Sequence, residues 1–83
     1  MAKASFEIGE TEKHLIFVNN NLFMKHITIE LDGEKIADEY HYSPMAKKFH
    51  FDVGSSEKHQ VEISVGGFSQ TELLVDGKAV QGS

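Results

Sequence analysis

The chain lacks several residue types, and each absence narrows what the protein can be. Its 83 residues include no cysteine, no tryptophan and no arginine, and only one proline. Without cysteine there is no disulfide framework, which permits a cytoplasmic location, and we expect the protein there. Without arginine the chain has no planar fork for binding phosphates or base edges.

Long apolar runs are also absent. No stretch approaches the roughly 20 apolar residues of a membrane-crossing helix, and residues 1–5 lead into no apolar segment of a signal peptide. The net charge is −5, from 13 acidic residues against 8 lysines. Nucleic acids and anionic membranes both attract positive charge. We therefore expect no nucleic-acid partner and no membrane partner.

The hydrophobic patterning predicts an all-β fold. Residues 27–31, 49–53 and 61–65 alternate apolar and polar side chains, as strands do when one face meets a core and the other meets water. Residues 14–18 form a short continuous apolar run, which we interpret as a strand covered on both sides. No window shows the 3.6-residue period of an amphipathic helix.

Turn signals recur at strand-length intervals. They are Asn19-Asn20-Asn21, Asp32-Gly33, Ser43-Pro44, Gly54-Ser55-Ser56, Gly66-Gly67 and Asp76-Gly77. This spacing is typical of an antiparallel sandwich or small barrel. We predict a single domain over residues 1–83, an antiparallel β-sandwich of about seven or eight strands built from consecutive hairpins.

The two Asp-Gly pairs are the strongest local signals. Each lies between apolar runs, where a tight type I′ turn requires positive φ at both central residues. Shared turn chemistry explains the likeness of the two strings without an internal repeat. Between Ser69 and Glu72 we expect a bulge or a crossing to the second sheet, because the apolar residues on either side differ in parity.

Loop lengths predict the strand register. We expect a two-residue loop at Asp32-Gly33, a four-residue loop over 43–46 and a five-residue loop over 54–58, because these choices place apolar side chains on one face. The predicted pairs are Leu31 with Glu34, Ile29 with Ile36, Tyr40 with Phe49, Glu39 with His50, Phe51 with Val61 and Phe49 with Ile63. We also expect the core to include Tyr40, Tyr42, Phe49 and Phe51.

This register places Glu39, His50 and Glu62 side by side on the outer face, with His41 beside them. A histidine between two carboxylates fits a surface ion pair, a proton-linked interaction switch, a metal site or a general base. The ion pair is favoured, because an outward sheet face offers no obvious concave site. The chain has no His-x-x-x-His, Cys-x-x-Cys, nucleophile elbow or phosphate loop. We expect no catalytic residue, no metal and no cofactor.

Apolar residues at turns are better candidates for binding. Phe23 follows the asparagine-rich turn and Phe68 follows the double glycine. Such a residue either caps the end of a sandwich or is exposed and marks a partner surface. Edge strands offer a second route, because an unprotected edge can pair with a partner strand or with another copy in a homo-oligomer.

The order of these motifs resembles the β-domain of the Fas apoptotic inhibitory molecule family. The similar strings are Leu31-Asp32-Gly33, Phe51-Asp52-Val53-Gly54, Val61-Glu62-Ile63-Ser64-Val65, Gly67-Phe68 and Leu73-Leu74-Val75-Asp76-Gly77-Lys78. The resemblance covers about two-thirds of the chain. It implies an antiparallel sandwich of about eight strands with a non-enzymatic role in protein interaction, linked in animals to survival signalling and protection from aggregation.

We predict a non-enzymatic protein-interaction module. The first alternative is a carbohydrate- or small-ligand-binding β-domain that uses exposed aromatic side chains. The second is an enzyme or metal protein built on the His50 row. The candidate interaction residues are Phe23, Phe68, Glu39, His41, His50 and Glu62.

Overall fold

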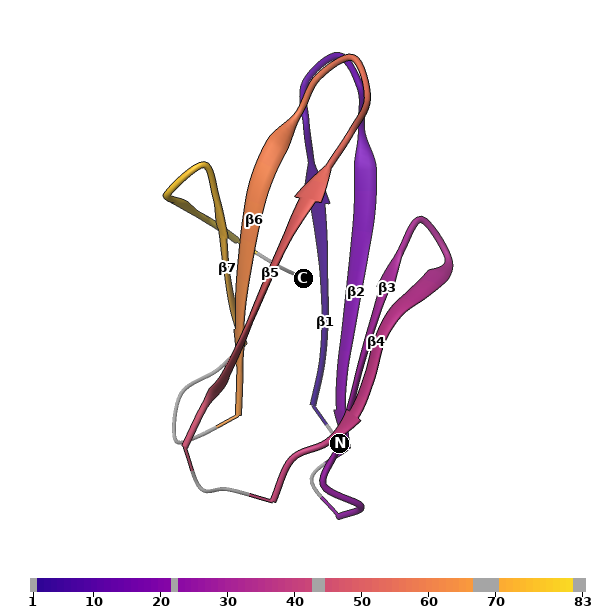
Figure 1. Ribbon diagram of the computed structural model, residues 1–83, viewed down its shortest axis with the longest axis vertical. Coiled ribbons are helices and arrows are strands. Elements are labelled where there is room, and N and C mark those ends of the chain that lie inside the picture. The colour runs from indigo at the N-terminus through magenta and orange to yellow at the C-terminus, as the bar shows by residue number, and fades with distance from the viewer. Residues whose placement is uncertain (1, 22, 43–44, 67–70, 82–83) are drawn as a thin grey trace.

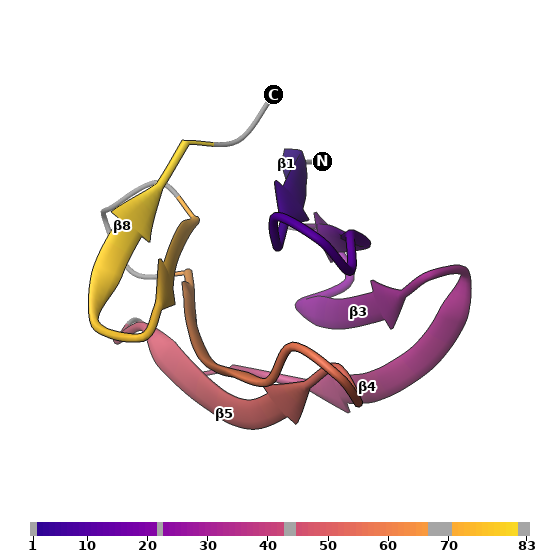
Figure 2. The same cartoon turned by 90° about the horizontal axis from the view of Figure 1, so that it is seen from above.

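The computed structural model describes residues 2–21, 23–42, 45–66 and 71–81, and these form eight strands and no helix. The strands form two antiparallel four-stranded sheets, in the orders β1-β2-β3-β4 and β5-β6-β7-β8 (Figures 1 and 2). The expected all-β sandwich of about eight strands is therefore confirmed. The strands are β1 (Ala2–Ile8), β2 (His14–Asn21), β3 (His26–Leu31), β4 (Glu34–Tyr40), β5 (Lys47–Val53), β6 (His59–Val65), β7 (Glu72–Val75) and β8 (Lys78–Val80).

Alternating apolar side chains build the core between the sheets. β2, β3 and β6 contribute most of the fully buried members, because they lie inside their sheets and have neighbours on both sides. Removing this apolar surface from water is the main driving force for folding. The buried apolar residues are Phe6, Ile8, Ile16, Val18, Ile27, Ile29, Val53, Val61, Ile63, Val65 and Leu73.

The Asp-Gly turns and the five-residue loop form as predicted. Asp32 and Gly33 have φ of 52° and 85°, and Asp76 and Gly77 have φ of 51° and 83°. Positive φ at both central residues is the signature of a type I′ turn. The 54–58 loop is confirmed by its flanking pairs, which include Phe51 with Val61 and Phe49 with Ile63. Leu31 also faces Glu34 as expected.

The first hairpin was not anticipated from the sequence. β1 pairs with β2 along its whole length, from Ala2 opposite Asn20 to Ile8 opposite His14. The predicted turn at residues 19–21 is wrong, because these asparagines belong to β2. The turn follows them, and the side-chain oxygen of Asn21 accepts hydrogen bonds from the backbone N–H groups of Phe23 and Met24.

The predicted hairpin at residues 43–46 is also wrong. β4 is the last strand of one sheet and β5 is the first of the other, so this connection crosses between sheets. Tyr40 therefore does not pair with Phe49, nor Glu39 with His50. The crossing expected between Ser69 and Glu72 is not needed, because β7 pairs with β6 in the same sheet. Residues 67–70, including Phe68, lie outside the described part of the chain.

The structure also differs from the sequence-based predictions in one register shift and in the exposure of three side chains. The β3–β4 register shifts between Ile29 and Glu30, so Ile29 faces Ala37 and not Ile36. Tyr40 is 58% exposed and Tyr42 is 74% exposed, so neither joins the predicted core. Leu15 is 51% exposed, because burial along β2 alternates and only one face is covered. Phe49 and Phe51 are partly buried against the core, as expected.

The two sheets repeat one another, which overturns the prediction that there is no internal repeat. Ile8 pairs with His14 and Val53 with His59, while Ile16 pairs with Leu31 and Val61 with Val75. Asp32 N–H donates to Leu15 and Asp76 N–H donates to Gln60, each at 2.8 Å. The sequence carries the same repeat as Gly-x-x-Glu-Lys-His, at residues 9–14 and 54–59. We call residues 2–42 and 45–81 the two halves.

Candidate functional site

The loops over 9–13 and 54–58 lie side by side at the top of the molecule in Figure 1 and bind each other through their glutamates. The Glu57 carboxylate accepts hydrogen bonds from the N–H of Glu10 at 2.9 Å and from the N–H of Thr11 at 2.7 Å. It also accepts one from the Thr11 hydroxyl at 2.6 Å. The second half thus supplies an acceptor for the backbone donors of the first.

The first half returns the same interaction. The Glu12 carboxylate accepts hydrogen bonds from the N–H groups of Ser55 and Ser56, both at 2.9 Å, and from the Ser56 hydroxyl at 2.7 Å. These hydrogen bonds stabilise the charged form and hold the pKa of Glu12 and Glu57 well below the usual range. We call this reciprocal pair the glutamate clamp.

A histidine lies behind each glutamate of the clamp. His14 Nδ1 lies 2.6 Å from Asp32 Oδ2, and its Nε2 lies 2.6 Å from Glu12 Oε2. Because both ring nitrogens face carboxylates, this geometry favours the imidazolium form, in which both nitrogens donate. The hydrogen bond to Asp32, and then that to Glu12, raise the pKa of His14.

The second half repeats this arrangement. His59 Nδ1 lies 2.6 Å from Asp76 Oδ2, and its Nε2 bonds Glu57. The pKa of His59 is raised by these hydrogen bonds, that to Asp76 foremost. Each Asp-Gly turn is thereby joined through a histidine to the clamp, a role that turn chemistry alone did not predict.

Two glycines make the clamp loops possible. Gly9 and Gly54 have φ of 95° and 102°, and a Cβ on either would overlap the carbonyl oxygen of Glu12 or Glu57 respectively. Only glycine lets the loop close tightly enough for its N–H groups to point together at one carboxylate. The clamp therefore requires glycine at positions 9 and 54 as well as the negative charges of Glu12 and Glu57.

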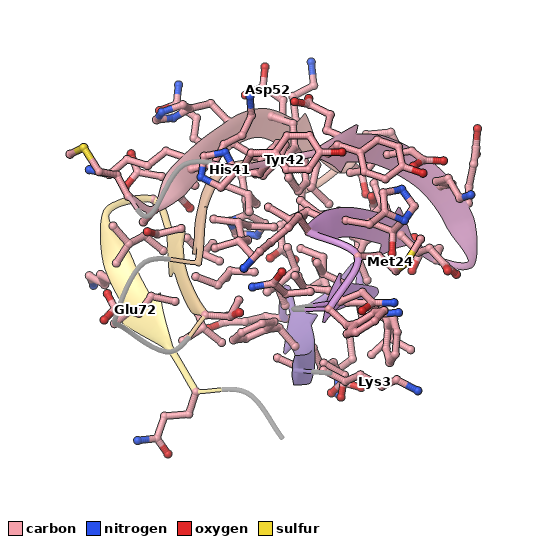
Figure 3. All side chains as sticks on the ribbon, turned by 90° about the horizontal axis from the view of Figure 1, so that it is seen from below. Lys3, Met24, His41, Tyr42, Asp52 and Glu72 are labelled. Atoms are coloured by element: carbon pink, nitrogen blue, oxygen red, sulfur yellow. The ribbon has the colours of Figure 1, made fainter. Side chains whose placement is uncertain are left out.

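The opposite end of the molecule carries exposed apolar side chains. Phe23 is 91% exposed, Tyr42 74% and Met45 73%, with Tyr40 and Met24 more than half exposed. Figure 3 views the molecule from this end and labels Met24 and Tyr42. We call the surface formed by Phe23, Met24, Tyr40, Tyr42 and Met45 the aromatic end.

Ring stacking and hydrogen bonds tie the aromatic end together. The rings of His26 and Tyr40 stack with centroids 4.7 Å apart, and those of Tyr40 and Tyr42 with centroids 6.1 Å apart and planes within 5°. His41 N–H donates to the carbonyl of Lys25 at 2.8 Å, which links the connection after β4 to the β2–β3 turn. These contacts link the rings of Tyr40 and Tyr42 to the start of β3 and to the β2–β3 turn.

The predicted polar row is only partly assembled. His50 and Glu62 are paired across β5 and β6, with 3.5 Å between Nε2 and Oε1. Glu39 belongs to the other sheet and binds Lys47 at 2.8 Å, so it does not join the row. His41 faces the connection between β4 and β5 instead, with its Nε2 2.5 Å from the carbonyl oxygen of Met45. A shallow hollow of about 360 Å³ lies beside His50 and Glu62 on the outer face.

Of the other predicted residues, Phe23 is exposed and does not cap the sandwich. Among the described residues, no group of three or more histidine and carboxylate side chains is arranged to hold a metal ion. Within the same ranges, no helix is long and apolar enough to span a bilayer.

Sequence reasoning missed both the clamp and the aromatic end. The clamp brings together residues about 45 positions apart, and the repeated Gly-x-x-Glu-Lys-His string was the signal that could have revealed it. Tyr40 and Tyr42 were assigned to the core because the connection after them was interpreted as a hairpin. No family model, curated protein or solved structure matches the chain.

Proposed function

We propose that the chain is a non-enzymatic protein-interaction module and that the aromatic end is its docking surface. The observation that carries this proposal is the exposure of Phe23, Tyr42 and Met45, each at least 73% open to solvent at one end of the molecule. Clustered exposed apolar side chains mark interaction sites in soluble proteins. Aromatic and methionine side chains are also the types enriched at interface cores.

The state of the histidines supports a non-catalytic role. His14 and His59 each have both ring nitrogens bound to carboxylates, so neither offers a nitrogen lone pair to a substrate. Both serve the clamp instead. The resemblance to the Fas apoptotic inhibitory molecule family fits the same proposal, as does a cytoplasmic location.

Site-specific photo-crosslinking tests the docking surface. A photoreactive amino acid at position 23 is expected to join a defined partner protein, or a second copy, in cell extract. The same group at Leu15, which is 51% exposed on β2, is the matched control. The adduct must disappear when Tyr42→Ser is added. Equal crosslinking from positions 15 and 23 would contradict the proposal.

A carbohydrate ligand is the second candidate function. The near-parallel rings of Tyr40 and Tyr42 favour it, because sugars stack on exposed aromatic rings. Titration of the labelled protein with neutral oligosaccharides, followed by NMR, should then shift signals of Tyr40 and Tyr42 and spare those of the clamp. Saturable shifts would favour a glycan over a protein partner.

A further inference from the structure

Unpaired positive charge gathers at the aromatic end, although the chain as a whole is negative. Lys3, Lys25 and Lys48 are exposed here and form no ion pair within residues 2–21, 23–42, 45–66 and 71–81. The nearby carboxylates are already neutralised, because Asp38 binds His26 and Lys35, and Glu39 binds Lys47. Glu72 is the exposed exception at the start of β7.

The clamp end carries exposed charges of both signs. Glu10, Glu34 and Asp52 are exposed there, as are Lys58 and Lys78, and none of the five has an ion-pair partner in the described part of the chain. The molecule is 37 Å long, whereas charges in physiological salt are screened within about 8 Å. A partner at the aromatic end therefore responds to the local lysines and not to the net charge of −5.

Lys25 lies within the surface itself. It is in the β2–β3 turn between Met24 and His26, with φ of 56°, and its carbonyl accepts the hydrogen bond from His41. The backbone beneath this ammonium group is thus fixed while its side chain is exposed. An apolar partner side chain resting on Phe23 or Tyr42 would bring its sequence neighbours within reach of Lys25.

We infer that the partner of the aromatic end is a protein segment that places carboxylates beside apolar or aromatic side chains. This rests on the proposed function and adds the chemical class of the partner. The apolar groups bind Phe23 and Tyr42, and the carboxylates pair with Lys25 and Lys48 around them. Charge complementarity at an interface rim selects partners and raises the association rate.

Two short labelled peptides test the inference by fluorescence anisotropy with the intact chain. Both alternate leucine or phenylalanine with a charged residue, which is glutamate in one peptide and lysine in the other. We expect the acidic peptide to bind roughly tenfold more tightly. The double variant Lys25→Glu and Lys48→Glu should reverse this order. The matched control, Lys58→Glu with Lys78→Glu at the clamp end, should leave it unchanged.

The outcomes separate the inference from the proposed function. Equal binding of both peptides, abolished by Phe23→Ser, would overturn the inference and leave the docking surface standing. Binding that survives Phe23→Ser with Tyr42→Ser would overturn the docking surface itself. Binding of neither peptide also overturns the inference, and adsorption to phosphatidylserine vesicles in that case would identify a lipid surface. Thermal unfolding of each variant verifies that it is folded.

Discussion

The Glu57 carboxylate binds Thr11 twice, accepting from its backbone N–H at 2.7 Å and from its hydroxyl at 2.6 Å, although the two residues lie in loops that connect strands of different sheets. Among the described residues, the strand ladders run within each sheet and none joins one sheet to the other. The clamp therefore joins the halves at one end by polar contacts, while apolar packing joins them in the core.

Neutralising one clamp glutamate should destabilise the fold. In Glu57→Gln the charge-assisted hydrogen bonds to Glu10 and Thr11 are lost, and an amide offers one acceptor oxygen where the carboxylate has two. We expect a lower Tm, and Glu12→Gln should lower it similarly because the two contacts are equivalent. Glu10→Gln is the matched control, since the side chain of Glu10 is exposed. Calorimetry that finds all three variants alike would refute a stabilising clamp.

Stability should be greatest in mildly acidic solution. The pKa values of His14 and His59 are raised, so their contribution is complete below the ordinary value of 6.5 and is lost as pH rises through the folded value. The pKa values of Glu12, Glu57 and Asp76 are lowered, so their contribution is present above the ordinary values of 3.8–4.5 and is lost as pH falls. The expected maximum lies between about pH 4.5 and 6.5.

Thermal unfolding measured from pH 3 to pH 9, roughly the span of these titrations, checks this profile. The double variant His14→Asn and His59→Asn should flatten the decline on the alkaline side. His50→Asn is the control, because His50 is exposed on the outer face. A decline of the same steepness in both variants would show that other groups cause it.

Four glycines with positive φ should separate into two classes. Gly33→Ala and Gly77→Ala add a Cβ that meets no atom within 4 Å, so only backbone strain is added, about 1 kcal/mol. In Gly9→Ala and Gly54→Ala the Cβ overlaps a backbone carbonyl oxygen, and the loop must open. We expect losses above about 3 kcal/mol in chemical denaturation. Four equal losses would mean that the clamp loops are not tightly closed.

Substitutions of a buried and an exposed isoleucine should also differ in their effect on stability. Ile63 is fully buried on β6, and Ile63→Ala should cost about 2–5 kcal/mol, since it removes buried methyl groups and leaves a cavity. Ile36 is 42% exposed on β4, and Ile36→Ala should cost less than about 1 kcal/mol. Urea denaturation of the two variants measures both values. A larger loss at Ile36 would place the core elsewhere.

Local patterns predicted much of the fold. The alternation in residues 61–65 and the chemistry of Asp32-Gly33 depend on neighbours in sequence, and both are confirmed. The connection after Tyr40 was misassigned because a hairpin loop and a crossing between sheets use the same turn residues. The clamp depends on contacts between distant residues, such as Glu12 with Ser56, which are 44 positions apart, and a pattern within one strand or turn does not encode such a contact.

Because the two halves repeat one fold, each half can be compared with the other, position by position. Wherever both halves keep the same residue in the same contact, as His14 and His59 do, folding is a sufficient explanation for it. Where the two halves carry different residues at equivalent positions, the shared fold does not explain the residue type. β4 runs for seven residues and β8 for three, so Tyr40 has no counterpart in β8. A comparison of the two halves therefore identifies the residues that the repeated fold does not require, and these are the residues that can be specialised for binding a partner.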